Sequence, residues 1–193
     1  MPELSEKARS AYHEAGHLFL GYNFRPAGIF WANISETDGR WGGDCRIYLS
    51  DVPDESRALV AVAGAVAEGR AAAISRTGSR QVRLSVTDAL VTQVLTFLGN
   101  NEDATQLDIS IEGTGETIET SISRHDTRWI VAALRNEAAI GQALQDVCDC
   151  CNDIDGWRTI KAVARLLHKE APHRVFNIKM RLSIEAALQG SGY

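Results

Sequence analysis

The sequence predicts a single, mainly helical domain of the α+β class, with one small β-hairpin or sheet. Between Leu4 and Tyr22, apolar residues recur at steps of three and four, which is the pattern of an amphipathic helix. The segment from Arg57 to Ile74 is rich in Ala and Val on every side, as expected of a helix buried in the core. Segments rich in Ile, Phe, Trp and Tyr stand between these two helices. We expect one domain over residues 1–193.

The hairpin or small sheet is expected directly after the first helix. Its strands are predicted at residues 27–35 and 45–50, where β-branched and aromatic residues gather. A long, Gly-rich connection at residues 36–43 is expected to join them. Asp51 and Pro53 then mark the start of the buried helix.

The second half of the chain is predicted to be helical, with one ambiguous stretch. In order, helices are expected at residues 85–98, 126–150 and 154–169 and in a last segment toward Leu188. Gly99 ends the first of them, and Pro172 separates the last two. Residues 102–123 are polar and show no clear period, with a candidate short strand at residues 108–111.

Composition and charge narrow the class of protein. Hydrophobic residues make up 45% of the 193 residues and charged ones 23%, a globular balance that argues against disorder. A net charge of −5 without a basic cluster argues against nucleic-acid binding. The N-terminal residues lack the apolar core of a signal peptide, and no apolar run reaches the roughly 18 residues of a membrane span. We therefore expect a cytoplasmic protein without a membrane span.

The four cysteines fit a reducing compartment. Cys45 stands alone, whereas Cys148, Cys150 and Cys151 crowd one helical stretch. A Cys-x-Cys-Cys run offers soft ligands for a metal, but no partner stands at a zinc-finger spacing. Free, buried thiols are therefore the expected state of these three residues.

The run His13-Glu14-Ala15-Gly16-His17 has the clearest chemical meaning, because it matches His-Glu-x-x-His. Residues four apart on a helix have Cβ atoms about 5–6 Å apart, so two imidazoles can bind one zinc ion. The carboxylate of Glu14 can reach a metal-bound water without being a ligand. Gly16 costs the helix about 1 kcal/mol relative to Ala, which suggests close approach of another backbone or of substrate. The alternative is a surface helix whose two histidines face solvent.

A catalytic zinc ion usually has three protein ligands, so a third is expected elsewhere in the chain. The metzincin arrangement would require Gly at position 20 and His at position 23, but Leu20 and Asn23 exclude that subclass. The remaining candidates by residue type are Glu68, Asp88, His125, His168 and His173. The three histidines of this set stand in polar or charged surroundings and are expected to be ordinary surface residues.

Three segments resemble the peptidase domain of the FtsH-type zinc proteases, in the same order along the chain. Residues 11–17 read Ala-Tyr-His-Glu-Ala-Gly-His, as the zinc helix of that family does. Residues 63–68 resemble its Ala-Gly-Arg-Ala-Ala-Glu helix, with Ala65 in place of the Arg. Residues 85–90 resemble the segment whose Asp completes the zinc site, with Thr87 in place of the usual Asn. The resemblance is strong over residues 8–94 and thin afterwards, where only a general run of helices corresponds.

The resemblance implies that Asp88 is the third zinc ligand, beside His13 and His17. The residues alone leave a second interpretation open, because Ser85-x-x-Asp88 is also a helix N-terminal signature. Glu68 matches a non-ligand Glu of the family. Two roles are open for it: a hydrogen bond with a zinc-bound imidazole, or a buried salt bridge with an arginine.

The resemblance further implies a zinc metallopeptidase in which Glu14 is the general base. Trp31 and Trp41 either line a substrate groove or serve as packing. The strand near residues 29–34 is a candidate for pairing with an extended peptide.

The family's ATPase module and membrane anchor have no counterpart in this sequence, and no phosphate-binding Gly-x-x-x-x-Gly-Lys-Ser/Thr occurs. The expected substrates are therefore peptides or already unfolded polypeptides, cleaved without ATP. The expected protein partners are further copies of the chain or a separately encoded ATPase. The alternatives are a non-peptidase zinc hydrolase and a binding module for unfolded chains.

Overall fold

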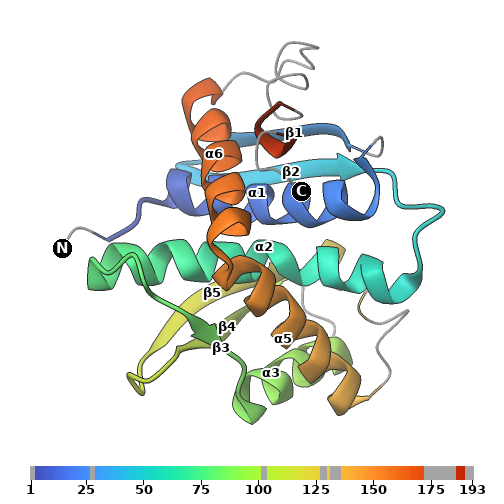
Figure 1. The fold of residues 1–193 in the computed structure, drawn as a ribbon, viewed down its shortest axis with the longest axis vertical. Helices are drawn as coiled ribbons and strands as arrows, with labels where there is room; N and C mark the ends of the chain where they lie inside the picture. Colours follow the sequence, from blue (N-terminus) through green and yellow to red (C-terminus); the bar gives the residue numbers. More distant parts are fainter. Residues whose placement is uncertain are drawn as a thin grey trace.

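The computed structural model describes residues 3–26, 29–100, 104–126, 130, 136–171 and 186–189. Two antiparallel helices, α1 (Glu6–Phe24) and α2 (Asp54–Thr77), lie at its centre (Figure 1). A two-stranded sheet lies on the α1 side and a three-stranded sheet on the α2 side. The other described helices are α3 (Asp88–Gly99), α5 (Glu137–Asn152) and α6 (Ile154–Glu170). The architecture is α+β and mainly helical, as the sequence predicts.

Helices α1 and α2 lie in direct contact because a glycine stands where they meet. A Cβ atom on Gly16 would clash with the backbone carbonyl of Ala63, so the close approach expected at Gly16 is made by the backbone of α2. Helix α2 is buried on most sides from Ala58 to Ala73. Among the described helices it alone is long and apolar enough to cross a membrane, but 78% of its most apolar window is buried inside the protein.

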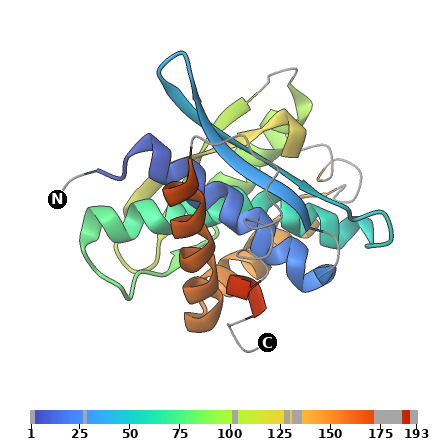
Figure 2. The ribbon, with the colours of Figure 1, turned by 90° about the horizontal axis from the view of Figure 1, so that it is seen from above.

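Strands β1 (Ile29–Thr37) and β2 (Arg40–Ile47) form an antiparallel hairpin that lies over α1 (Figure 2). The turn contains only Asp38 and Gly39, with φ values of 52° and 77°. Positive φ at both central residues is the geometry of the tightest hairpin turns. The expected long connection at residues 36–43 is therefore wrong, because most of that segment belongs to the two strands.

The second sheet consists of β3 (Leu84–Ser85), β4 (Ala104–Ile111) and β5 (Thr117–Ser123), all antiparallel to their neighbours. The sequence predicts only part of β4, because β5 looks polar. Alternate residues of β5 are nevertheless buried, and one of them is Thr120. Its hydroxyl donates to the carbonyl of Ala65 in α2 at 3.0 Å. Because one buried position of β5 is polar, the alternation of apolar and polar residues that is typical of a strand is not visible in the sequence.

The later segments predicted to be helical contain helices, but the first residues of these helices differ from those predicted. Helix α3 begins at Asp88 because Thr87 caps it, its hydroxyl accepting from the backbone N–H of Leu90 at 3.2 Å. The side chains of Asn136 and Asp153 cap α5 and α6 in the same manner. The helix predicted at residues 126–150 is therefore not continuous: residues 124–126 and 130 are helical, and α5 begins separately at Glu137.

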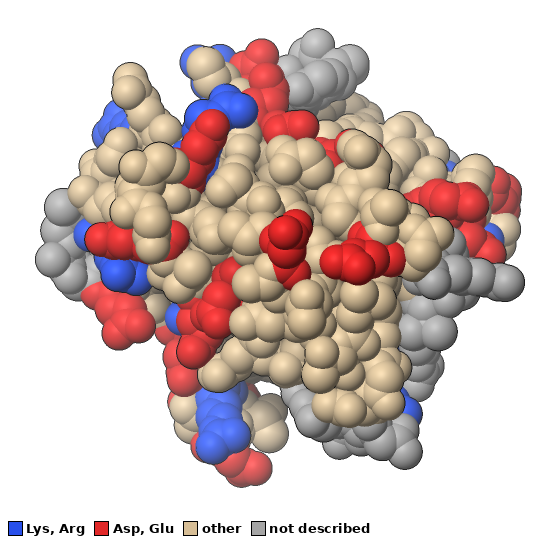
Figure 3. All heavy atoms as spheres, turned by 90° about the horizontal axis from the view of Figure 1, so that it is seen from below, with Lys and Arg blue, Asp and Glu red and all other residues tan. Residues whose placement is uncertain are grey.

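The C-terminal expectations fall mostly outside the described residues. Pro172 and most of the last predicted helix lie there, whereas residues 186–189 are helical. The face seen from below carries acidic side chains scattered over a largely uncharged surface, with fewer basic ones (Figure 3), in keeping with the net charge of −5.

The three cysteines of α5 are free thiols, as expected. Cys148 and Cys151 are buried and Cys150 is partly exposed. Burial, assisted by the nearby Asp149, raises the pKa of Cys148 to about 12, so this thiol stays protonated near neutral pH. None of the three belongs to a group of potential metal ligands among the described residues.

Candidate metal centre

Helix α1 presents His13, Glu14 and His17 to the protein interior. Its N-terminus is capped by Ser5, whose hydroxyl accepts from the backbone N–H of Ala8 at 3.3 Å. The two imidazole rings meet edge to face with their centroids 4.8 Å apart. His17 is buried, and only 15% of the His13 side chain is exposed. The alternative of two solvent-facing histidines is therefore wrong.

Both imidazoles are held at Nδ1, which leaves Nε2 of each facing the same space. Nδ1 of His17 donates to the carbonyl of Val60 at 2.7 Å. Nδ1 of His13 lies 3.1 Å from Oε2 of Glu68, and the other oxygen of this carboxylate accepts from Nε of Arg9 at 2.8 Å. Glu68 therefore makes both contacts considered from the sequence, the histidine hydrogen bond and the arginine salt bridge. Such outer contacts are how proteins orient metal-binding histidines.

Asp126 brings a carboxylate to the two free imidazole nitrogens. Its Oδ1 lies 3.6 Å from Nε2 of His17, and its Oδ2 lies 3.8 Å from Nε2 of His13. These distances are too long for hydrogen bonds. They approach the separation of about 3.4 Å between two ligands of one tetrahedral zinc ion. Ser123 orients the carboxylate, because its hydroxyl and backbone N–H donate to Oδ2 at 2.6 and 3.2 Å.

The structure thus corrects the assignment of Asp88 as the third ligand. Ligand atoms of His13, His17 and Asp126 all lie within 4.8 Å of one another, and Asp88 is not part of this group. Asp88 is exposed in the first turn of α3, outside the cleft described below. An acidic residue in that position is favoured by the helix dipole. Asp88 thus lies in a first helical turn, as the helix N-terminal interpretation has it, although the cap is Thr87 and not Ser85, which belongs to β3.

The centre is strongly negative apart from its histidines. Burial alone would lower the pKa of the His13 imidazole, but Asp126, Glu68 and Glu14 outweigh it and raise this pKa to about 10. In the opposite sense, burial would raise the pKa of Asp126, but His17 and His13 hold it well below its usual range. The carboxylates thus favour a positive charge between these side chains, the environment that a divalent cation requires.

Gly64 of α2 packs directly against the two imidazoles. A Cβ atom there would clash with Nε2 of His17 and would lie 2.7 Å from Nε2 of His13. A side chain at this position would therefore displace the two nitrogens that lie near Asp126. Two imidazole nitrogens and a carboxylate are a donor set that zinc accepts, so the residues present fit such an ion in their chemistry.

We expect Gly64→Ala to weaken zinc binding by more than the 10–100-fold that loss of an outer hydrogen bond typically costs. The added methyl group would push the two Nε2 atoms out of place and would disturb the hydrogen bonds to Val60 and Glu68 that orient the rings. Competitive titration against a chromophoric chelator measures the affinity.

The matched control is Gly141→Ala in α5, where the new methyl group makes only an ordinary contact with Val91 at 3.6 Å. Both substitutions favour their helices by about 1 kcal/mol. Unchanged zinc affinity in Gly64→Ala would show that the two imidazoles do not bind the ion in the positions described.

Strand β2 covers Glu14, whose side chain is buried beside the centre. Glu14 is only 5% exposed. A Cβ atom on Gly43 would clash with its carboxylate, and Cys45, two residues further along β2, lines the same cleft. Burial raises the pKa of Glu14, against the opposing effect of His17 and His13.

A cleft of about 870 Å³ opens onto these residues. Residues 40–45 of β2 border it on one side and residues 119–123 of β5 on the other. Trp41 is among the lining residues, whereas residues 31–37 of β1 are not. The described residues 31–34 of the strand predicted to pair with a peptide therefore do not line this cleft. His125 lies at the rim of the cleft with 71% of its side chain exposed.

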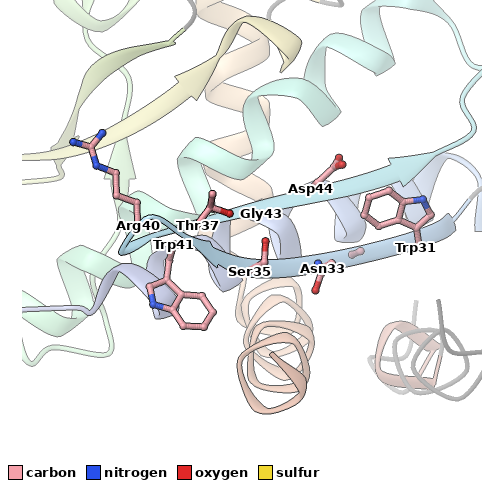
Figure 4. Close-up of a pocket in the computed structure, with 10 residues that line it drawn as sticks. Trp31, Asn33, Ser35, Thr37, Arg40, Trp41, Gly43 and Asp44 are labelled. Atoms are coloured by element: carbon pink, nitrogen blue, oxygen red, sulfur yellow. The ribbon is translucent and has the colours of Figure 1, made fainter. Parts of the chain in front are cut away.

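Two other predicted site residues lie elsewhere. Trp31 lines a second groove of about 660 Å³ on the outer face of the hairpin, together with Asn33, Ser35 and Asp44 (Figure 4). His168 is exposed on α6, as expected of a surface histidine. His173 lies outside the described residues.

Comparison with known proteins adds no further constraint on this centre. No family model matches the chain, and neither a curated protein nor a solved structure is significantly similar to it.

Proposed function

We propose that the chain is a zinc-dependent peptidase of peptides and unfolded polypeptides, related to the FtsH-type peptidases by its local motifs. The observation that carries this proposal is the arrangement of four side chains. The imidazoles of His13 and His17 converge with the carboxylate of Asp126, and Glu14 lies beside them without belonging to the group of potential ligands. A structural zinc site would have a fourth protein ligand. Among the described residues this group has three.

In the proposed reaction, Nε2 of His13, Nε2 of His17 and the carboxylate of Asp126 would hold a zinc ion. Such an ion would act as a Lewis acid and would lower the pKa of a bound water from about 15.7 toward about 7. Glu14 accepts a proton from the water that attacks the peptide carbonyl carbon and passes it to the amine that leaves as the C–N bond breaks. Glu68 and the carbonyl of Val60 hold Nδ1 of the two imidazoles, so that Nε2 of each would be the atom offered to the ion.

The proposed substrate is an extended chain because the cleft is bordered by a strand edge. A two-residue turn closes on a hydrogen-bonded pair, here Thr37 with Arg40, and hydrogen-bonded and non-hydrogen-bonded pairs then alternate. Gly43 and Cys45 therefore occupy non-hydrogen-bonded pairs, whose backbone N–H and C=O groups point away from β1. Within the described residues, β2 has no partner on that side. A polypeptide main chain can add to such an edge.

We expect the purified chain with zinc to cleave casein and a permanently unfolded protein, to stop on addition of a chelator, and to recover with zinc. The same protein in its native form should remain intact, with or without ATP and magnesium, because unfolding costs about 5–15 kcal/mol and the chain has no phosphate-binding loop. Gel electrophoresis of the digests provides the measurement.

Three outcomes would count against the proposal. Hydrolysis that continues in the presence of a chelator would show that the reaction does not need a metal ion. Rapid ATP-stimulated loss of the native protein would contradict the expected substrate class. Binding of unfolded protein without any hydrolysis would identify a binding module.

A further inference from the structure

We propose that Arg9 is a positioning residue of the metal centre: its guanidinium holds the Glu68 carboxylate in the orientation that receives the His13 imidazole. The inference rests on the proposed function, because it takes His13 as a ligand of the ion. It assigns a task to an arginine that no motif in the sequence connects with this centre.

Three side chains in contact link Arg9 to the candidate ligand. Nε of Arg9 donates to Oε1 of Glu68 at 2.8 Å, and Oε2 of the same carboxylate lies 3.1 Å from Nδ1 of His13. Arg9 and His13 stand four residues apart on α1, so they share a face of that helix. Glu68 lies on α2 and meets both of them, with only 6% of its side chain exposed. The orientation of the imidazole therefore depends on where this carboxylate is held.

A second contact fixes the guanidinium itself. Nη2 of Arg9 donates to the backbone carbonyl of Glu119 at 2.6 Å. Glu119 belongs to β5, which is the edge strand of its sheet. A guanidinium is planar and rigid, so two donors that are bound at once leave it little freedom to rotate. Arg9 is thus held between β5 and Glu68, although 26% of its side chain is exposed.

The charge of Arg9 is unfavourable for a cation site unless the residue orients a neighbour. A positive side chain near the centre repels a divalent cation, so Arg9 acting only as a charge would lower zinc affinity. Arg9 acting as a positioning residue would raise zinc affinity, because a histidine whose hydrogen-bond partner is held in place binds the ion more tightly. The two roles therefore predict opposite signs when Arg9 is replaced by an uncharged residue.

The zinc affinity of variants provides the first test. We expect Arg9→Met to weaken zinc binding by about tenfold, the lower end of the range for lost outer contacts, in a competitive titration against a chromophoric chelator. The matched control is Arg83→Met, which removes an ion pair of the same length, 2.8 Å to Glu112, at the surface and outside the cleft. The control should bind zinc as the parent does. Unchanged or tighter zinc binding by Arg9→Met would overturn the proposal.

A double-mutant cycle tests whether Arg9 acts through Glu68. In a Glu68→Ala protein, Arg9→Met should change zinc affinity by less than about twofold, because the carboxylate that Arg9 positions is already absent. A further tenfold loss in that protein would overturn the proposal, since Arg9 would then act through its contact with β5. Thermal unfolding of the metal-free proteins checks the fold, and Arg9→Gln provides the same test if Arg9→Met does not fold.

Cobalt in place of zinc provides a readout of the ligand arrangement that needs no hydrolysis. We expect the visible absorption bands of the cobalt protein to change in Arg9→Met and to stay as in the parent in Arg83→Met, because these bands depend on the coordination geometry. Bands identical to those of the parent in Arg9→Met would overturn the proposal. Zinc binding without hydrolysis by the parent would refute the proposed function alone, and the titrations would still decide the role of Arg9. A parent that binds no zinc would refute both.

Discussion

Glu14→Gln is expected to lower peptide hydrolysis by about 10²–10⁴-fold, the usual contribution of a general base, while zinc content stays at the parent level. Glutamine has nearly the shape of glutamate, so the packing against Gly43 persists. It cannot accept the proton from water. Because Glu14 is not in the group of potential ligands, its loss should not release the ion. Peptidase kinetics and metal analysis of the purified variant measure the two effects.

The matched control for this substitution is Glu55→Gln. Glu55 is exposed in the first turn of α2 and does not line the cleft. The Glu55→Gln protein should hydrolyse peptide at the rate of the parent. A Glu14→Gln protein with parental activity would show that Glu14 is not the base, even if the metal is required.

Asp126→Ala is expected to reduce zinc affinity by more than a hundredfold and to abolish hydrolysis, because one of three ligands is removed. Asp126→Asn is the companion variant. It keeps the size of the side chain and a carbonyl that can accept from Ser123, so its fold should be less affected while the charge is lost. Competitive zinc titration measures the affinity, and thermal unfolding of the metal-free proteins monitors the fold.

Two further substitutions test whether Asp126, and not Glu68 or Asp88, is the third ligand. Glu68→Ala should weaken zinc binding by about 10–100-fold, as expected when the partner of a ligating histidine is lost. Asp88→Ala should have little effect, because Asp88 is exposed outside the cleft. If Asp88→Ala releases the metal and Asp126→Ala retains it, the structural assignment is wrong and the one based on resemblance is restored.

The sequence by itself determined the parts of this protein that depend on local spacing. Two histidines one helical turn apart must lie on one face of α1. Gly16 predicted the close approach of another backbone or of substrate, and the backbone of α2 makes this contact. The composition of α2, apolar on every side, predicted its burial. A buried carboxylate needs partners, and those of Glu68 are His13 and Arg9.

Only the tertiary structure decided which acidic side chain joins the histidines. Ser85-x-x-Asp88 and Ser123-x-x-Asp126 are equivalent as local patterns, and both fit a helix start. They differ in what lies next to them in space: Asp126 follows β5, which is held against α2 through Thr120, whereas Asp88 lies at the exposed start of α3. Gly43 meets Glu14 for the same kind of reason, since the path of β2 over α1 depends on packing between segments far apart in the chain. Local spacing specifies which residues share a helix face, and long-range packing specifies which elements meet there.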